Sequence, residues 1–195
     1  LLVCFATLLL GTLVLVPTVL VVAYYFPKLD PWMNLLILLP FAVPPVVSSV
    51  GLLQIYADGP LPIIGTPWIL VGTWFTVVLP FMYRALANSL QGVPLRDLMD
   101  SDRQLGASST RAFALLELPN LRKGLLAALF LSLSFLLGEF VFANMLVGTR
   151  YETLQVYLYN MRATSGHFTS ALVRSYFLLT LLTLLLTWAA NRFHR

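Results

Sequence analysis

Residues 1–26 read LLVCFATLLLGTLVLVPTVLVVAYYF and contain no charged side chain. As a helix this stretch would be roughly 39 Å long at about 1.5 Å per residue, enough to cross a bilayer with some tilt. Backbone N–H and C=O groups in hydrocarbon must be hydrogen-bonded inside the protein, so we expect a helix, kinked at Pro17. This segment alone predicts an integral membrane protein.

Four further apolar stretches predict an all-α membrane fold with five transmembrane helices. The 195 residues are 59% hydrophobic and only 10% charged, outside the balance of a soluble domain. The later spans are expected at residues 33–57, 64–86, 124–146 and 171–190. We treat residues 1–195 as a single transmembrane domain. Because the chain starts with Leu and no basic segment precedes the apolar run, we expect it to begin partway through a longer protein.

The second stretch carries Pro40, Pro44 and Pro45 near its middle. Prolines at this density are expected to break or bend the helix near mid-membrane. Irregular backbone at that depth survives only where it is buried in protein or faces a water-filled cavity. Pro44 and Pro45 are therefore candidates either for a packing kink or for a break that lines a transport pathway.

The distribution of basic residues predicts the orientation in the membrane. With five spans, Arg150, Arg162 and Arg174 lie on one side, and the other nine of the twelve Lys and Arg residues lie on the opposite side. The excess of positive charge is expected in the cytoplasm. The long polar stretch 87–123 and the C-terminus are thus predicted to be cytoplasmic, and the N-terminal end to lie outside.

Two smaller features flank the predicted spans. Trp68 and Trp74 lie near one end of the third span and Tyr83 near the other, which suits an aromatic belt at the membrane interfaces. Residues 148–170 are expected to contain a brief surface helix or strand. The periodicity of the apolar residues there does not distinguish the two.

The stretch 87–123 is too long and too polar for a passive connection. Pro94 can open a helix at its first position, and Gly106 can close it with a left-handed cap. A second short helix is expected to start near Ser108 or Ser109 and must stop before Pro119. Two amphipathic helices on the cytoplasmic face are therefore predicted, and such a pair alone could simply lie on lipid headgroups.

The spacing within this stretch resembles the EAA loop of ABC importer permeases, whose pattern is Glu-Ala-Ala, three residues, Gly, nine residues, Ile-x-Leu-Pro. The positions that match, from the leading acid to the final proline, are Asp100, Gly106, Leu116, Leu118 and Pro119. Ser101 and Asp102 depart from the two usual alanines. The segments LPFAVPPVVSSVGLL, LPFMYRAL, LGAS and LGEF also look like that family, so the resemblance covers nearly the whole chain.

The resemblance implies a type I ABC importer permease fold, in which two such subunits form a pore. The polyamine, ferric-ion, thiamine and phosphonate permeases look most similar and often have six spans, which leaves one N-terminal span unaccounted for. The implied partners are a dimer of cytoplasmic ATP-binding subunits, a second permease of the same or a homologous kind, and a periplasmic or lipid-anchored solute-binding protein. The implied location is the inner membrane of a bacterium or archaeon. The residues implied to couple to the ATPase are Asp100, Asp102, Leu105, Gly106, Ala107, Leu116, Leu118 and Pro119.

Glu139 is the one acid well inside a predicted span. An acid within the membrane is a functional candidate by default. It could meet a cationic solute such as a polyamine, but a structural or gating role is favoured because the LGEF-like motif looks common to relatives with different cargo. Asn144, Pro44 and Pro45 join Glu139 as candidate residues of the substrate pathway.

Other function classes lack the residues that they need. No Gly-rich phosphate loop is present, so a partner is expected to bind and hydrolyse ATP, and no enzyme activity, cofactor or metal site is expected here. The scattered basic residues do not favour nucleic-acid binding. The lone Cys4 excludes a disulfide within the chain. A secondary transporter fragment, which would need coupling acids in several spans, and a structural membrane subunit remain the alternatives.

Overall fold

Three long apolar helices form the centre of the molecule. The computed structural model describes residues 1–57, 59–91, 118–162 and 166–192, which form helices and contain no strand. The helices α1 (Leu2–Tyr25), α5 (Pro67–Leu90) and α8 (Leu118–Gly138) are each long and apolar enough to cross a membrane. The first and third predicted spans and the all-helical membrane fold are therefore confirmed.

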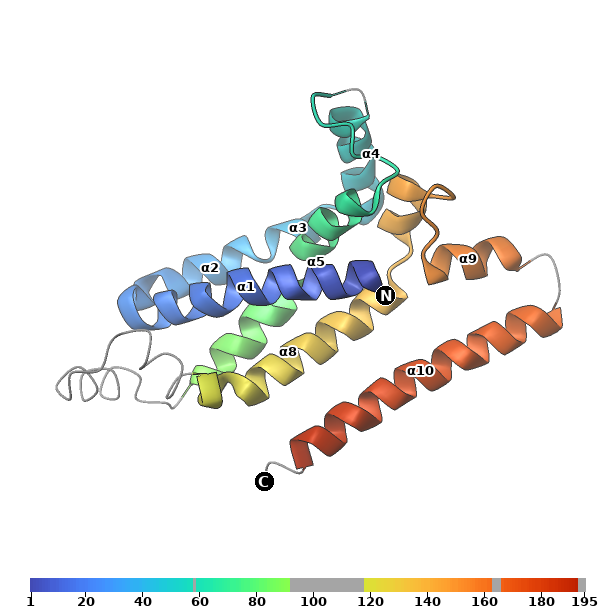
Figure 1. Cartoon of the computed structure of the whole chain (residues 1–195). Coiled ribbons are helices and arrows are strands. Elements are labelled where there is room, and N and C mark those ends of the chain that lie inside the picture. The colour runs from blue at the N-terminus through green and yellow to red at the C-terminus, as the bar shows by residue number, and fades with distance from the viewer. Residues whose placement is uncertain (58, 92–117, 163–165, 193–195) are drawn as a thin grey trace.

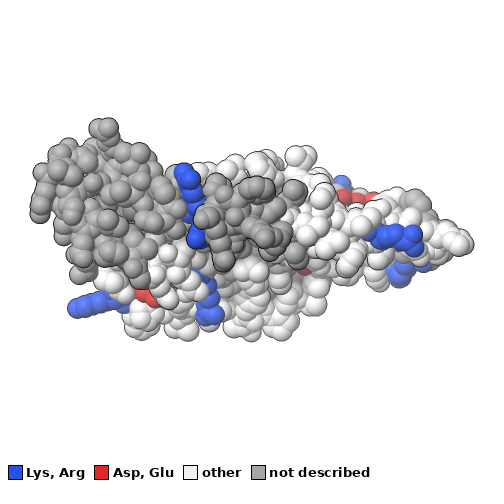
Figure 2. Space-filling view, turned by 90° about the horizontal axis from the view of Figure 1, so that it is seen from below, with Lys and Arg blue, Asp and Glu red and all other residues white. Residues whose placement is uncertain are grey.

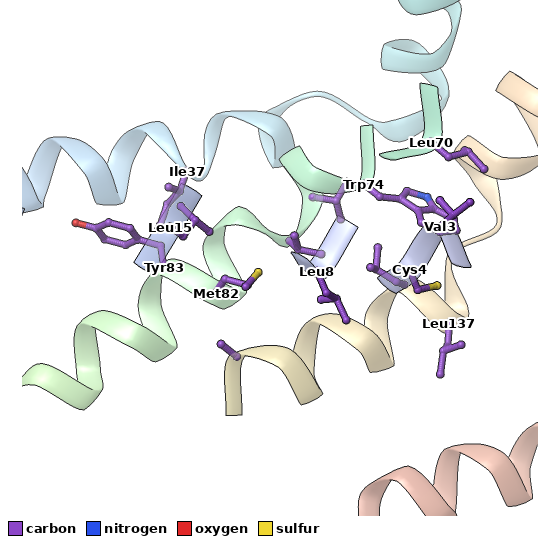
Figure 3. Packing of buried hydrophobic residues seen from close by; sticks show 14 of the residues in the cluster. Val3, Cys4, Leu8, Leu15, Ile37, Leu70, Trp74, Met82, Tyr83 and Leu137 are labelled. Carbon is purple, nitrogen blue, oxygen red and sulfur yellow. The ribbon is translucent and has the colours of Figure 1, made fainter. Parts of the chain in front are cut away.

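The helix α5 lies between α1 and α8 and packs against both (Figure 1). The helices α1 and α5 run in the same direction, and α8 runs the opposite way, so that the start of α1 lies near the end of α8. Figure 3 shows the core side chains that α1 and α5 turn toward one another. Because Gly11 has no side chain, Met82 can approach α1: a Cβ atom at residue 11 would lie 2.6 Å from the Met82 sulfur.

The helices α5 and α8 approach even more closely at Gly124. A Cβ atom there would overlap the side chain of Ser89 and lie 2.8 Å from the carbonyl oxygen of Ala85, both on α5. Small residues let helices approach in this way in membranes, where packing rather than the hydrophobic effect drives helix association. Gly124 therefore sets the distance between the two helices near the ends that the 92–117 stretch connects.

The second apolar stretch is broken, as the prolines predict. After the short η1 (Pro27–Leu29) come α2 (Asp30–Leu36), α3 (Leu39–Ala42) and α4 (Pro45–Tyr56). The two halves, 27–42 and 45–56, meet at an angle of 85°. Pro44 is extended, with φ −56° and ψ 139°, and Pro45 opens α4, where its missing N–H group costs no hydrogen bond. The pair adds a fourth candidate span if both halves belong to one crossing.

The fourth predicted span, 124–146, is wrong at its end. The helix α8 ends at Gly138, and residues 139 and 140 are not helical. A second helical segment, 141–147, follows and includes the π-helix η3 (Ala143–Val147). Glu139 consequently lies at the end of a span and not within its helix. Apolar composition continues past residue 138 and so conceals the break.

The region after the break contains one short and one long helix. The helix α9 (Leu154–Met161) shows that the segment 148–170 holds a helix and not a strand. The helix α10 (Gly166–Arg192) packs against α8 and α9. Its apolar stretch Ser170–Leu182 is shorter than a full span, so the fifth predicted crossing stays a prediction.

On the face shown in Figure 2, charged side chains lie at the right of the molecule and over its left part, including beside the grey residues near the middle. The other described residues on this face are mostly uncharged. Many large apolar side chains on α1, α4 and α10 are exposed, as helices that face lipid or another subunit require. The structure thus presents extensive apolar surface on these helices.

We predict that Gly124→Val separates α5 from α8 and lowers the free energy of unfolding by about 1–3 kcal/mol, the usual effect of overpacking. The single cysteine, Cys4, is buried, so its reaction with a thiol-reactive dye during heating in detergent reports unfolding. Gly72→Ala on α5 is the control, because the added Cβ meets nothing within 4 Å apart from its chain neighbours and the backbone of its own helix. An unchanged unfolding temperature for Gly124→Val would show that the close approach does not constrain the packing.

Candidate functional site: the Glu139 junction

Most of the predicted coupling residues lie outside the described residues: Asp100, Asp102, Leu105, Gly106, Ala107 and Leu116. Leu118 and Pro119 are the first two residues of α8, where a proline is tolerated because early N–H groups have no partner in the helix. The 92–117 stretch therefore connects α5 and α8, the two helices that pack most extensively against each other. The roles of these residues stay predictions.

The carboxylate of Glu139 accepts three hydrogen bonds at the break after α8. The indole Nε1 of Trp74 donates to Oε2 over 2.9 Å. The backbone N–H of Phe142 donates to Oε1 over 2.8 Å, and that of Ala143 donates to Oε2 over 3.2 Å. In the described part of the chain, N–H groups and not a basic side chain therefore satisfy this acid.

Burial and backbone geometry explain why the acid occupies this position. The Glu139 side chain is only 8% exposed, and a carboxylate at such a site is costly unless hydrogen bonds satisfy it. The first N–H groups of a helix lack partners within the helix and carry partial positive charge, so an anion is stabilised there. Glu139 directly follows α8, and its side chain accepts hydrogen bonds from the first N–H groups of the segment 141–147.

Trp74 joins this junction to α5 and does not belong to an interfacial belt. It is 2% exposed, whereas Trp68, six residues earlier on the same helix, is 69% exposed. Figure 3 shows the Trp74 ring beside Val3 at the start of α1. The prediction of an aromatic belt is wrong for Trp74, because the indole N–H finds its acceptor inside the protein.

The helix α9 also contacts the end of α8 beside Glu139. The amide Nε2 of Gln155 donates to the carbonyl oxygen of Leu137 over 2.9 Å, which satisfies a carbonyl in the last turn of α8. A cavity of about 230 Å³ lies between α1, α8 and α9 and is lined in part by Trp74 and Glu139. Segments distant in sequence therefore meet at the Glu139 junction, which we define as Trp74, Leu137, Glu139, Phe142 and Gln155.

A second polar contact ties the opposite end of α5 to α2. The hydroxyl of Tyr83 donates to Oδ1 of Asp30 over 2.8 Å, and the amide of Asn34 donates to Oδ2 over 3.0 Å. Tyr83 is fully buried, so it too is wrongly predicted as an interfacial residue. The helix α5 is consequently held by two hydrogen bonds from buried aromatic side chains, Trp74 in its first half and Tyr83 in its second half.

The candidate pathway residues lie around the segment 141–147 and α4, which pack against each other. Pro44 and Pro45 form the corner before α4. A cavity of about 600 Å³ between this corner and α5 is lined mainly by apolar side chains, together with hydroxyls such as those of Thr73 and Thr76. Asn144 lines a different pocket, beyond the Glu139 junction. The structure thus brings these predicted residues to one end of the molecule without placing them in one cavity.

Sequence reasoning found Glu139 but not its partners. Trp74 could have been proposed, because a buried tryptophan needs an acceptor and Glu139 is an acid in an apolar segment. Gln155 and Asp30 gave no pattern that links them to α8 or α5. Their contacts depend on which helices lie together, which no short motif in the chain specifies.

The comparison with known families agrees with this architecture. The family described as "Binding-protein-dependent transport system inner membrane component" matches residues 8–195. The chain belongs to this family and is a multi-pass membrane protein.

Two relatives show the range of named transport systems. PhnV of Salmonella typhimurium, named as a 2-aminoethylphosphonate transport system permease protein, is 29% identical over 137 residues, which are 70% of this chain and 51% of PhnV. ModB of Haemophilus influenzae, named as a molybdenum transport system permease protein, is 30% identical over 177 residues, covering 80% of this chain and 76% of ModB. The chain spans about half the length of the PhnV proteins that it matches.

We predict that Trp74→Phe destabilises the junction, because it leaves one oxygen of a buried carboxylate short of a donor while the ring still fills its site. Losing a hydrogen bond to a charged group costs about 1.5–3 kcal/mol. The expected result is earlier exposure of Cys4 to the thiol dye on heating. Trp68→Phe, at an exposed position on the same helix, should leave the unfolding temperature unchanged. Equal behaviour of the two variants would contradict a structural role for the indole N–H.

Proposed function

We propose that this chain is the permease subunit of an ATP-driven ABC importer and forms part of the translocation pathway for a small solute delivered by a binding protein. The observation that carries the proposal is the family match over residues 8–195 together with the EAA-like spacing between Asp100 and Pro119. The names of PhnV and ModB agree with a permease of this kind. The solute of this chain belongs to the polyamine, ferric-ion, thiamine or phosphonate type under this proposal.

The position of the coupling loop supports the mechanism. A partner ATPase would close on nucleotide binding and move a short helix of the 92–117 stretch. That stretch continues directly into α5 and α8, which run alongside each other to the Glu139 junction. A rigid helix of 24 residues spans roughly 36 Å at about 1.5 Å per residue, so a displacement at one end is felt at the other.

The direction of the helices supports five crossings. The helices α1 and α5 run in parallel, and the Asp30–Tyr83 contact joins the segment after α1 to the far end of α5. Under this proposal, the bent pair 27–56 carries the chain back across the bilayer before α5 begins. With α10 as the fifth crossing, the 92–117 stretch and the C-terminus are cytoplasmic, in the inner membrane of a bacterium or archaeon.

Glu139 has a structural or gating role in this proposal. Both of its oxygens are occupied by donors from the protein, and the side chain is buried, so a cationic solute would have to displace existing hydrogen bonds. The junction joins α5 to the segment that follows α8. Two arrangements of that junction, each favoured by one state of the ATPase, would couple nucleotide binding to the pathway.

The proposed partners supply the parts that this chain lacks. A dimer of cytoplasmic ATP-binding subunits hydrolyses ATP, a second permease of the same or a homologous kind completes the pore, and a periplasmic or lipid-anchored binding protein delivers the solute. A secondary transporter fragment or a structural subunit would need no ATPase. Copurification of an ATP-binding subunit with the full-length protein therefore separates these alternatives.

We predict that a cysteine at Ser109 reacts with a membrane-impermeant thiol reagent only from the cytoplasmic side, and one at Thr164 only from outside. Both are made in a background with Cys4→Ala. The expected pattern follows from the bias of nine basic residues against three. Labelling of intact cells compared with inverted vesicles gives the measurement, and a reversed pattern would overturn the orientation.

Two substitutions in the predicted loop should uncouple the ATPase. Gly106→Val forces a β-branched residue into a left-handed position between two helices, and Asp100→Lys replaces attraction to a basic partner by repulsion that can cost several kcal/mol. The expected result for both is normal membrane insertion with reduced ATPase copurification and reduced hydrolysis stimulated by the binding protein.

The control for these variants is Thr180→Val on α10; the Thr180 hydroxyl donates to the backbone carbonyl oxygen of Tyr176 in the same helix. It should copurify and hydrolyse ATP like the unmodified protein. Normal copurification and normal stimulated hydrolysis in both loop variants would show that the loop does not couple, and an amphipathic pair resting on lipid would replace that role.

A further inference from the structure

A pocket of about 570 Å³ lies on the far side of the Glu139 junction, between the segment 57–65 and the segment 144–150. The polar side chains that line it come from Asn144, Thr149 and Arg150, and no carboxylate among the described residues lines it. The rest of the lining is apolar side chains and glycine backbone. Among the described residues, Arg150 is therefore the one charged side chain that lines this pocket.

The guanidinium of Arg150 lies across Gly65. A Cβ atom at Gly65 would be 2.6 Å from Cδ of the arginine and 3.0 Å from Nη1. Gly65 also has a φ of +81°, a conformation that costs little only for glycine. Its N–H donates to the carbonyl oxygen of Leu146 over 2.9 Å, which joins the two segments. The Arg150 side chain therefore packs directly against the backbone of Gly65.

Among the described residues, the polar groups of the pocket leave hydrogen-bonding capacity unused. Neither the guanidinium of Arg150 nor the amide of Asn144 hydrogen-bonds to another described side chain or backbone group, and both residues are exposed. A guanidinium presents five N–H donors in a planar fork, which fits two oxygens of one oxyanion. An amide NH₂ and a hydroxyl can donate to the remaining oxygens.

We propose that this pocket binds an oxyanionic group of the phosphate or phosphonate class. Arg150 pairs with the charge, and Asn144 and Thr149 donate to the same group. The proposal rests on the proposed function where the source of the group is a solute in transit. The headgroup phosphate of a lipid presents the same chemistry at the outer membrane face, and the experiment separates the two sources.

The test uses the full-length permease, purified with its partner subunits in a maltoside detergent that contains no phosphorus. Methylphosphonate is titrated in, and its binding is followed by line broadening in phosphorus-31 NMR. We expect saturable binding that Arg150→Gln weakens by about tenfold or more, because the charge-assisted bonds are lost. Gly65→Ala should weaken it similarly, since the added methyl group displaces the arginine.

Arg162→Gln is the matched control. Arg162 follows the last residue of α9. Its Cζ atom lies 3.6 Å from the centroid of the Tyr159 ring, and Arg162 is not among the residues that line the Arg150 pocket. It should bind methylphosphonate like the unmodified protein. Equal weakening in Arg150→Gln and Arg162→Gln would show only diffuse attraction by positive charge and would overturn the site.

Two further outcomes are decisive. Retention of a phospholipid that Arg150→Gln releases, without methylphosphonate binding, would support the site and assign the headgroup as its source. Absence of both would overturn the proposal. ATPase copurification should be normal in all these variants, so its loss would count against the proposed function and not against the pocket.

Discussion

The buried carboxylate of Glu139 is the constraint around which this structure is arranged. An acid that is 8% exposed in an apolar protein must be satisfied, and here the donors are one indole and two backbone N–H groups. For these three bonds to form, α8 must end at Gly138 and the next helical segment must begin at residue 141. The helix α5 must also place Trp74 beside Glu139. Removing the acid would leave the first N–H groups of the segment 141–147 without an acceptor, so the break and the packing of α5 depend on the same side chain.

The consequences extend along α5 to the opposite end of the molecule. Tyr83 binds Asp30 there, and Gly124 lets α8 approach α5 where the chain leaves for the 92–117 stretch. The helices α5 and α8, which flank the proposed coupling loop, thus pack against each other, and α5 is also bonded to the bent pair through Asp30. In the proposed importer, force from an ATPase would reach the Glu139 junction through packed helices, and the pocket at Arg150 lies just beyond that junction. In that proposal, the packed helices α5 and α8 would join a cytoplasmic input to the proposed site at Arg150.

The sequence predicts the parts of the fold that depend on local composition and proline chemistry. Apolar length identifies α1 and α5, and the prolines identify the corner before α4. The end of the fourth span is missed because residues 140–147 are mostly apolar, while the backbone is interrupted at Glu139, whose side chain bonds to Trp74 of α5. The same reason explains the misplacement of Trp74 and Tyr83, whose acceptors lie 65 and 53 residues away in the chain. Within the candidate site, Glu139 was identifiable as an acid in an apolar stretch. The contacts of Gln155 with Leu137 and of Arg150 with Gly65 depend on long-range packing.

The most direct test of the Glu139 junction is a double-mutant cycle that combines Trp74→Phe with Glu139→Gln in the full-length protein. Unfolding free energies in detergent are measured for the two single variants and the double variant. If the indole and the carboxylate act as one unit, the losses are not additive, and the coupling energy is about 1–2 kcal/mol, within the range for residues in direct contact. Additive losses, with a coupling energy near zero, would contradict the account and show that the break after α8 is held by packing alone.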